Sequence, residues 1–452
     1  MTHICSDNSV RLSLPEDVNF IIDTITKAGY EAFAVGGCIR DMLLNRTPDD
    51  YDITTSASCE TVKSLFKRCL DTGIKHGTVT VMLKEKGYEV TTYRVDGIYE
   101  DCRHPKDVTF TNDLSEDLKR RDFTINAMAY NEEIGLVDLF EGRKDIEKKI
   151  IRCVGNPYER FNEDALRMLR AVRFSAQLGY EIDEETKKAV SSLAGNISKI
   201  SEERIQVELL KMVTSDHPEK IRDAYELGLT GVFFPEFDKM METSQYNPHH
   251  CYSVGEHTIK SMENVPKDKY LRLGMLFHDT GKPKVIKRGE DGYDHFHGHP
   301  SESEKIAEKV LKRLKFDNET IKTVSDLAFY HDYNVPGTPK GVRRALRKMG
   351  PEMFRMILDV KRADILAQSD YKRQEKLDAV KKLEELFNEI LKNHECFSLK
   401  DLNITGNDLM VLGYPKGPKI GKELNRLLDR VLEDPSLNDK EILLKLSRED
   451  MQ

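Results

Sequence analysis

The sequence predicts an α+β protein, with a small mixed β-sheet head domain followed by a mostly α-helical neck, middle region and tail. Two observations lead to this fold class. Up to about residue 145, short runs rich in β-branched residues, such as "GTVTVML" and "YEVTTYRV", alternate with short helical segments. Beyond that point, apolar residues recur at helical spacing through almost the whole chain. Because 452 residues suffice for several hydrophobic cores, we predict regions at 1–150, 151–235, 236–370 and 371–452.

The composition restricts the setting in which the protein works. The formal net charge is −8, so no overall basic field indicates a nucleic-acid binder, although a local basic face remains possible. The eight cysteines are scattered and form no Cys-x-x-Cys pair, which is typical of reduced thiols in a cytosolic protein. The chain begins without a signal-peptide pattern and holds no apolar run of about 18 residues. We therefore expect a cytoplasmic protein that does not enter a membrane.

The head begins with a helix at 17–28, which Gly29 ends, and continues with a strand, "EAFAVGG", that closes on a glycine turn. A short helix "CIRDMLLN", a strand "DYDITTS" and a helix "CETVKSLFKRC" follow. The runs "GTVTVML" and "YEVTTYRV" are predicted to form a hairpin across "KEKG". The polar segment "DGIYEDCRHPKDVTFTNDLSEDL" lacks periodicity and is predicted to be a loop. The run "GLVDLF" is a β-like return.

The helical part begins with "NEDALRMLRAVRFSAQLGY", which we predict to be one helix between Asn162 as N-cap and Gly179 as stop. "SEERIQVELLKMV" predicts a second helix, with acidic residues in its first turn. The mixed segment 235–250 predicts a boundary. A histidine-bearing helical region to about 335, a basic helical stretch to about 395 and a tail from 397 complete the chain.

Two carboxylates in the head predict a cation site. Asp50 and Asp52 stand two residues apart on a predicted strand and would therefore point to the same face. Adjacent like charges are costly unless a cation neutralises them, and hard oxygen ligands suit Mg²⁺. Glu89, a polar residue in a β run, is a candidate third carboxylate. The alternative is that Asp-x-Asp is merely a solvated strand end.

A glycine turn precedes these carboxylates and predicts a phosphate site. Gly36 and Gly37 lead into a short helix, so backbone and N–H groups could approach a triphosphate closely, and Arg40 could neutralise phosphate charge. A Gly-Gly turn alone carries little information. Its order with the carboxylates, within about twenty residues, is a nucleotidyltransferase arrangement.

The runs "GGCIRDMLL", "PDDYDITTSA", "LKRRDFTINAMAY" and "RFNEDALRMLRAVRF" together resemble the bacterial class II tRNA nucleotidyltransferases, that is, the CCA-adding enzymes and the related poly(A) polymerases. The resemblance is strong over 17–235 and weaker over 397–450. It implies that Asp50 and Asp52 hold the catalytic metals, and that Asp49 is a neighbour rather than a ligand. It also implies that "RRD" lies at the ribose. The nucleotide-binding residues that it implies are Gly36, Gly37, Arg40, Arg120, Arg121, Asp122, Asn126, Asp164, Arg167, Arg170 and Arg173.

The "NEDALR" motif resembles the family's protein template for the incoming base. On one helix Asp164 and Arg167 would share a face, where the carboxylate accepts from an exocyclic amine and the guanidinium donates to a ring acceptor. This pair could read cytosine or adenine. The alternative is an ordinary surface ion pair, worth a few tenths of a kcal/mol.

The loop "DGIYEDCRHPKDVTF" also resembles the family, in which it is associated with the switch from C to A addition. Its presence, with Asp101, Arg103 and His104, argues against an enzyme that adds only CC. CCA addition, A addition and poly(A) synthesis all remain open.

The middle region carries histidines in "EHTIKS", "MLFHDTGKP", "HFHGHPSES" and "FYHDYN", a pattern that resembles the HD metal-dependent phosphohydrolases. The resemblance implies a divalent cation and hydrolysis of phosphoesters. A lone histidine is more often structural. The metal ligands that we assign are His257, His278, Asp279 and Asp332, with His299 as a further candidate.

Two basic segments are candidates for RNA contact. "KGVRRALRKMG" places lysines and arginines along one helix, either as a phosphate-tracking stripe or as a solvated face. "YPKGPKIGKELNRLL" resembles the family's tRNA-binding tail, where Lys416, Lys419 and Lys422 are the candidate RNA-binding residues.

The sequence therefore predicts a CCA-adding tRNA nucleotidyltransferase that uses CTP, ATP and Mg²⁺, with a possible second divalent metal in an HD domain. One alternative is a tRNA A-adding enzyme or a poly(A) polymerase. The other is an HD-domain phosphohydrolase that acts on cyclic phosphates or nucleotides. The oligomeric state does not follow from the sequence.

Overall fold

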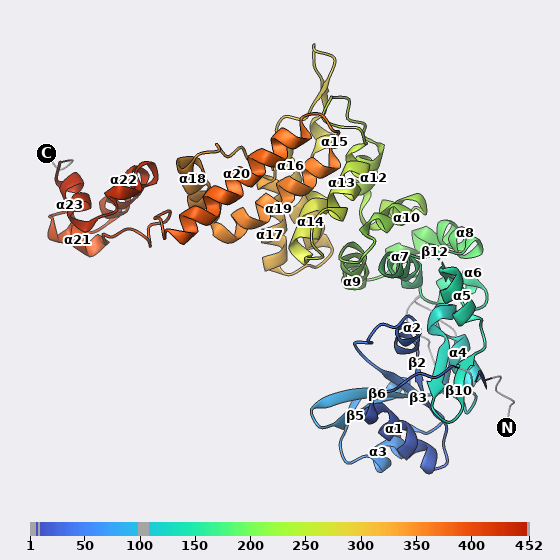
Figure 1. Ribbon diagram of the computed structural model, residues 1–452. Coiled ribbons are helices and arrows are strands. Elements are labelled where there is room, and N and C mark those ends of the chain that lie inside the picture. Colours follow the sequence, from blue (N-terminus) through green and yellow to red (C-terminus); the bar gives the residue numbers. More distant parts are fainter. Residues whose placement is uncertain (1–5, 8–9, 98–107, 450–452) are drawn as a thin grey trace. The chain divides into compact units, whose positions relative to one another are not determined.

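The computed structural model describes residues 6–7, 10–97 and 108–449, and the chain divides into two compact units, Met1–Pro235 and Glu236–Gln452. Of the loop predicted over 96–118, residues 98–107, which include Asp101, Arg103 and His104, lie outside the described residues. Unit 1 is coloured blue to green in Figure 1. Its strands are β1 (Ser6–Asp7), β2 (Ala32–Val35), β3 (Asp52–Thr55), β4 (Cys69–Gly73), β5 (Thr78–Leu83), β6 (Lys86–Thr92), β7 (Arg94–Asp96), β8 (Val108–Phe110), β9 (Met128–Asn131), β10 (Gly135–Asp138), β11 (Ile150–Ile151) and β12 (Glu181–Ile182). Its helices are α1 (Glu16–Lys27), α2 (Gly37–Leu43), α3 (Cys59–Leu65), α4 (Leu114–Lys119), α5 (Gly142–Lys148), α6 (Pro157–Glu163), α7 (Leu166–Leu178), α8 (Glu184–Leu193), α9 (Glu202–Val213), α10 (Ile221–Glu226) and α11 (Thr230–Phe233). Most of the next helix, α12 (Pro235–Glu242), belongs to unit 2.

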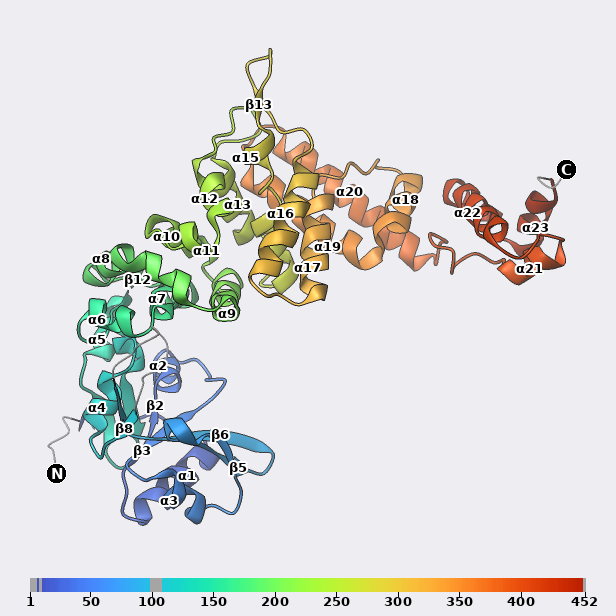
Figure 2. The same cartoon turned by 180° about the vertical axis from the view of Figure 1, so that it is seen from behind.

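The head is built on a mixed sheet with the strand order β1-β10-β9-β2-β3-β6-β5-β4. Among the described strands of this sheet, β3 and β6 alone pair in parallel, and this pairing sets Ile53 opposite Val90. Helices α1 and α3 pack against strands of this sheet, α1 on β2 and β3, and α3 on β5 and β6 (Figure 2). The apolar residues of α1 recur at helical spacing and are buried, as the sequence predicts. The parallel β3–β6 pair matters for function because it brings Asp52 and Glu89 to adjacent strands.

The predicted head elements form, with three corrections. The end of the predicted loop is not irregular, because it contains the strand β8 and the helix α4, which Asp113 caps through the N–H of Ser115. The helix predicted over "CETVKSLFKRC" ends at Leu65, and Cys69–Gly73 is the edge strand β4. The strand predicted over "DYDITTS" is shorter and begins at Asp52, so Asp50 precedes the strand instead of lying within it. The hairpin across "KEKG" is confirmed, because β5 and β6 pair with Leu83 opposite Lys86.

The single helix predicted over "NEDALRMLRAVRFSAQLGY" is wrong, because the chain breaks between α6 and α7. Asp164 has an extended backbone (φ −140°, ψ 103°), and its Oδ1 accepts the N–H of Leu166 at 3.1 Å. Aspartate competes with helix hydrogen bonds in this way and therefore favours helix ends. Gly179 ends α7 in a left-handed conformation, as predicted. Asp164 and Arg167 consequently do not lie on one helical face.

Unit 2 is almost wholly helical. After α12 it contains the helices α13 (Val254–Glu263), α14 (Lys269–Phe277), α15 (Lys282–Val285), α16 (His299–Arg313), α17 (Asn318–Tyr330), α18 (Pro339–Met349), α19 (Pro351–Ala367), α20 (Arg373–Lys392), α21 (Gly406–Val411), α22 (Pro418–Glu433) and α23 (Lys440–Glu449). The strands β13 (Lys287–Arg288) and β14 (Asp294–His295) form a small hairpin. No helix within the described ranges combines the length and the apolar character that a membrane crossing requires.

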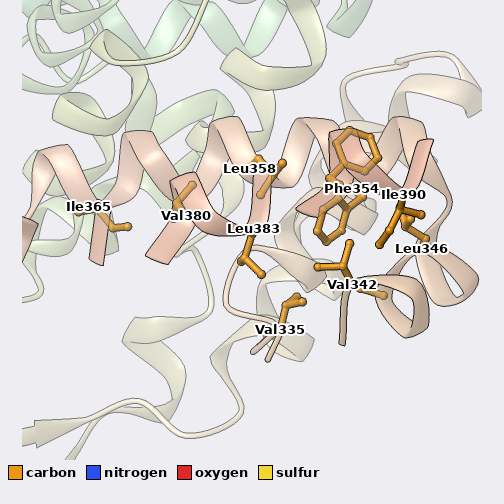
Figure 3. Packing of buried hydrophobic residues seen from close by; sticks show 11 residues of the cluster. Val335, Val342, Leu346, Phe354, Leu358, Ile365, Val380, Leu383 and Ile390 are labelled. Carbon is orange, nitrogen blue, oxygen red and sulfur yellow. The ribbon is translucent and has the colours of Figure 1, made fainter. Parts of the chain in front are cut away.

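One core of unit 2 joins α18, α19 and α20. Figure 3 shows Phe354 and Leu358 of α19 packed toward Leu383 and Ile390 of α20 and Val342 of α18. The rings of Phe354 and Phe387 lie 5.2 Å apart between centroids. These side chains are at most a few per cent exposed, so the three helices form one packed layer.

The arginine stripe of α18 contacts protein, which bears on its predicted contact with RNA. Arg343 is 4 % exposed and donates to the backbone oxygens of Leu432 and Glu433 and to the carboxylate of Glu395. The stripe also forms ion pairs through Lys340 and Arg344 with Glu433, and through Arg347 with Asp429. These hydrogen bonds and ion pairs connect α18 to the tail helix α22.

Arg343→Met is expected to loosen this attachment, whereas Arg344→Met is not. Arg343 donates to carbonyls at the end of α22 that otherwise lack helical partners, and such charge-assisted bonds contribute about 1.5–3 kcal/mol. Arg344 makes an exposed pair, worth at most about 1 kcal/mol. Hydrogen exchange should show faster amide exchange in α22 for Arg343→Met only. Equal exchange in both variants and in the parent chain would contradict this role of Arg343.

Candidate functional site

A polar cavity of about 480 Å³ lies in unit 1. All eleven residues predicted to bind the nucleotide line it, together with Asp50 and Asp52. Its wall also contains residues that sequence reasoning missed, namely Leu166, Phe174, Arg204 and Lys211. The lining residues come from the turn into α2, the start of β3, the segment after α4, and the helices α7 and α9. Segments far apart in the sequence therefore form one site within unit 1.

The carboxylates converge at one edge of the head sheet. Asp52 opens β3, Asp50 lies two residues earlier, and Glu89 lies on the adjacent strand β6. The protein packed around Asp52 raises the pKa of its carboxyl, and the Asp50 and Glu89 charges raise it further, against the opposing effect of Arg121. Mutually repelling carboxylates with hard oxygen donors fit a bound Mg²⁺. Glu89 does not line the cavity itself.

The glycine turn lies directly against an arginine of the site. Gly36 has φ 86° and ψ −132°, a conformation that disfavours any residue with a side chain. A Cβ at Gly36 would lie 3.2 Å from Nη1 of Arg121. Gly37 then begins α2, which carries Arg40 into the same cavity. The turn therefore allows the backbone at Gly36 and the guanidinium groups of Arg121 and Arg40 to reach the same anion.

Asp117 holds the two arginines of the "RRD" motif. Its carboxylate is fully buried and accepts from Arg120 at 2.8 Å and from Arg121 at 3.3 Å. Burial would raise the pKa of Asp117, but the two guanidinium groups outweigh that effect and lower it. Sequence reasoning missed Asp117, although an acid three and four residues before the arginines, on a short helix, is a signal for such pairing.

Asp122 and Asn126 link the motif to two other elements. Asp122 Oδ2 accepts from Nε of Arg170 at 2.7 Å, and Asn126 Oδ1 accepts from Arg40 at 2.8 Å. Asp122 is 8 % exposed, and burial would raise the pKa of its carboxyl, but Arg170 and Arg167 lower it overall. Asp122 is therefore an anchor for arginines in the site.

Glu208 is a second buried carboxylate that sequence reasoning missed. It lies on α9, is 4 % exposed and accepts from Nε of Arg173 at 2.9 Å. The guanidinium of Arg173 also lies 3.6 Å from the ring centroid of Phe174. No local spacing predicts this pair, because the two residues are 35 positions apart.

The two predicted base readers have separate partners. The guanidinium of Arg167 donates to the carboxylate of Glu163. It also donates to the backbone oxygens of Arg160 and Arg120, both at 3.1 Å. Asp164 instead pairs with Arg204 of α9. Both Asp164 and Arg167 line the cavity, but they reach it as independently anchored groups.

Unit 2 holds a second polar cavity, of about 330 Å³, which Asp279, His299 and His331 line. Around it, two groups of side chains could each hold a metal ion: His257, His278 and Asp279, and Asp279, His299 and His331. His278 follows α14 and His331 follows α17, as helix C-caps. Every one of these side chains is at least nine-tenths buried.

The histidine tautomers favour a cation at the centre. The Nδ1 atoms of His278, His299 and His331 lie 2.6, 2.9 and 2.8 Å from backbone oxygens, so each Nδ1–H donates outward. Their Nε2 lone pairs then face inward, with those of His299 and His331 only 3.1 Å apart. Two facing acceptors repel each other unless a cation lies between them. The donor set therefore fits a divalent metal.

Asp364 is a carboxylate at the histidines that sequence reasoning did not single out. Asp364 Oδ1 lies 2.7 Å from Nε2 of His257 and 3.9 Å from Nε2 of His278. Asp332 and Asp364 both line the cavity, Asp332 as an exposed residue, and both stand outside the two candidate groups among the described residues. His331 was quoted in the sequence motif but was not chosen as a ligand. Asp332 stays a predicted ligand, and the structure adds His331 and Asp364 as candidates.

The three candidate RNA-binding lysines lie around the start of α22. Lys416, Lys419 and Lys422 are all exposed. Their role in RNA binding stays a prediction.

Comparison with known families supports the amino-terminal assignment. Residues 32–152 match the family model described as the poly A polymerase head domain. Residues 179–241 match a model described as the probable RNA and SrmB-binding site of polymerase A. Residues 296–446 match a model described as tRNA nucleotidyltransferase domain 2, putative.

Full-length relatives share a single description. A CCA-adding enzyme of Pediococcus pentosaceus is 36 % identical over 441 residues, which cover 96 % of this chain and 99 % of that protein. One of Enterococcus faecalis is 33 % identical and covers 95 % of this chain and 94 % of its own. The crystal structure of the Bacillus stearothermophilus CCA-adding enzyme in complex with CTP has a TM-score of 0.71 at 28 % identity and covers 96 % of each chain.

Proposed function

The chain belongs to the family of CCA-adding enzymes, and from this premise we propose that it adds C, C and A to the 3′ end of tRNA, using CTP and ATP without a nucleic-acid template. One observation carries the proposal for this chain. A single cavity collects two carboxylates suited to Mg²⁺, a glycine turn, the arginines and the base-edge readers Asp164 and Arg167.

The proposed reaction is a nucleotidyl transfer. The 3′-hydroxyl oxygen of tRNA attacks the α-phosphorus of the nucleotide, a P–O bond forms, and the bond to pyrophosphate breaks as the hydroxyl proton leaves to solvent. Mg²⁺ bound by Asp50 and Asp52, with Glu89 beside them, would activate the hydroxyl and stabilise the leaving pyrophosphate. The chain itself orients the substrates.

Each group in the cavity has a proposed part in this orientation. The turn at Gly36 and Gly37 allows the triphosphate to come close, and Arg121, held by Asp117, donates to it. Arg167 donates to N3 of cytosine or N1 of adenine. The Asp164 carboxylate accepts from the exocyclic amine of either base, which uracil and guanine lack at that position.

Incorporation assays test the proposal directly. Transfer RNA that lacks its CCA end, and tRNA that ends in CC, are incubated separately with labelled CTP or ATP and Mg²⁺. We expect two C residues on the first substrate with CTP alone, complete CCA with both nucleotides, and one A on the second substrate. UTP and GTP should not replace CTP or ATP.

The same assays separate the related alternatives. Use of ATP only, on tRNA that ends in CC, would indicate an A-adding enzyme. Long A tails on an unrelated RNA primer would indicate a poly(A) polymerase. If no nucleotide is incorporated on any substrate, the nucleotidyltransferase proposal fails.

We propose a second activity, the metal-dependent hydrolysis of phosphoesters, at the cavity of unit 2. The observation that favours it is the buried group of imidazoles whose Nε2 lone pairs face the Asp279 carboxylate, at 3.3 Å for His278 and 3.4 Å for His299. A divalent metal bound there would activate water for attack on phosphorus. Lys282, whose Nζ lies 2.7 Å from Asp279 Oδ2, lines the same cavity and offers a positive charge to a phosphate.

We also propose that the protein works in the cytoplasm and that its tail contacts tRNA through Lys416, Lys419 and Lys422. The cysteines within the described ranges are free thiols, as in a reducing compartment. Exposed lysines at the start of α22 suit phosphate oxygens.

A further inference from the structure

Asp164 is held by a partner that no local pattern indicates. Arg204, on α9, donates from Nη1 to Oδ1 of Asp164 at 3.2 Å and from Nη2 to Oδ2 at 2.7 Å. The two residues are 40 positions apart, and both line the nucleotide cavity. Such a two-point contact fixes the plane of the carboxylate as well as its position.

The contacts of Asp164 determine what it can offer a base. A carboxylate has about four acceptor sites. Arg204 takes one on each oxygen, and the N–H of Leu166 takes a second on Oδ1, at 3.1 Å. About one acceptor site therefore remains, on Oδ2. A carboxylate held in this way presents one fixed acceptor to the cavity.

A fixed single acceptor discriminates between bases. Cytosine and adenine each turn an exocyclic N–H toward such a group, whereas uracil and guanine turn an oxygen toward it. A carboxylate that is free to rotate can turn away from an oxygen or bridge to it through water. Discrimination therefore depends on what prevents the rotation, and here Arg204 does so.

A purely structural role for the ion pair is less well supported. The Arg204 and Asp164 side chains are 25 % and 16 % exposed, so the pair is partly solvated and contributes little stability. Helices α7 and α9 already pack closely through apolar residues such as Leu169 and Leu209. The pair lies on the cavity wall rather than in that apolar core.

We propose that Arg204 is a positioning residue that acts through Asp164 to set the preference for bases with an exocyclic amine. This inference rests on the proposed function, because it concerns the nucleotide that the cavity takes. In this proposal Asp164 contacts the base, and Arg204 acts by restricting the Asp164 carboxylate.

Four variants test the proposal: Arg204→Met, Arg204→Lys, Asp164→Asn and the double variant. The control is Lys188→Met on α8, where an exposed lysine pairs with Glu185. The measured quantity is the kcat/KM for CTP divided by that for UTP, on tRNA without its CCA end. Thermal unfolding checks that each variant is folded.

We expect Arg204→Met to lower this ratio by about 10- to 100-fold, the effect of a misplaced contact group. Arg204→Lys keeps the charge but not the two-point contact and should give an intermediate ratio. Because Arg204 acts through Asp164, adding Arg204→Met to Asp164→Asn should lower the ratio no further. Lys188→Met should match the parent chain.

Two results would overturn the inference. An unchanged ratio in Arg204→Met, with all nucleotides slowed equally, would make Arg204 structural or a triphosphate ligand. Independent effects in the double variant would show that it does not act through Asp164. If Arg204→Met incorporates nothing, the ratio of the Kd values for CTP and UTP, measured by calorimetry, decides in the same way. Failure of the parent chain to incorporate CTP would instead contradict the proposed function.

Discussion

Asp52→Asn is expected to reduce CTP incorporation by about 10³-fold or more, which corresponds to about 4 kcal/mol of transition-state stabilisation. Asp52 opens β3 beside Glu89, and its pKa is raised by the surrounding protein and by the neighbouring carboxylates, Asp50 among them. The amide keeps the size of the side chain but removes the charge that attracts Mg²⁺. Single-turnover kinetics with labelled CTP measures the loss.

Asp49→Asn is the matched control for this prediction. Asp49 is exposed, lies three residues from Asp52 and does not line the cavity. Its variant should stay within about 3-fold of the parent chain, since surface substitutions change stability by at most about 0.5 kcal/mol. Equal losses in the two variants would contradict a specific metal role for Asp52. So would a fully active Asp52→Asn.

The second large effect is expected for Asp364→Asn in unit 2. Asp364 Oδ1 lies 2.7 Å from Nε2 of His257, so its charge belongs to the candidate metal site. Loss of that charge should lower the affinity for a divalent metal by about 10- to 100-fold, measured as the metal bound to the purified chain by mass spectrometry. Hydrolysis of a 2′,3′-cyclic nucleotide should fall with it.

Asp332→Asn is the matched control, because Asp332 lines the same cavity as an exposed residue, whereas Asp364 lies against His257. It should keep the bound metal, and both variants should still incorporate CTP into tRNA. The reverse result, with metal lost from Asp332→Asn only, would restore the assignment made from the sequence. If the parent chain holds no metal and hydrolyses no phosphoester, the second activity fails.

The residues predicted to bind the nucleotide could be grouped from the sequence because their motifs are local. The glycine turn, Asp50 with Asp52, and the "RRD" motif each occupy a few consecutive residues, and all of these line one cavity. Their roles stay predictions. The fold class is also confirmed, since a mixed sheet in the head is followed by helices. Period and turn chemistry are properties of neighbouring residues, which a sequence displays directly.

The errors concern residues whose state depends on distant partners. The helix predicted through Asp164 breaks, because its carboxylate caps Leu166 and pairs with Arg204. Asp332 was assigned from the family resemblance and stays a prediction, whereas Asp364, which lies against His257, was not singled out. The stripe on α18 was interpreted as an RNA contact or as a solvated face. Its arginines also contact α22, and both interpretations stay open for its exposed members.

The sequence by itself determined the order of the elements, the fold class and the chemical groups of both sites, because these follow from local periodicity and from side-chain chemistry. Only the tertiary structure decided which carboxylate pairs with which arginine or histidine. Asp117 and Glu208 anchor arginines of the nucleotide cavity, Arg204 restrains Asp164, and Asp364 completes the histidine cluster. Most of these pairs join residues tens of positions apart. Asp117 and Glu208 are buried, which makes their pairing with arginines obligatory, since a buried charge without a partner is strongly unfavourable.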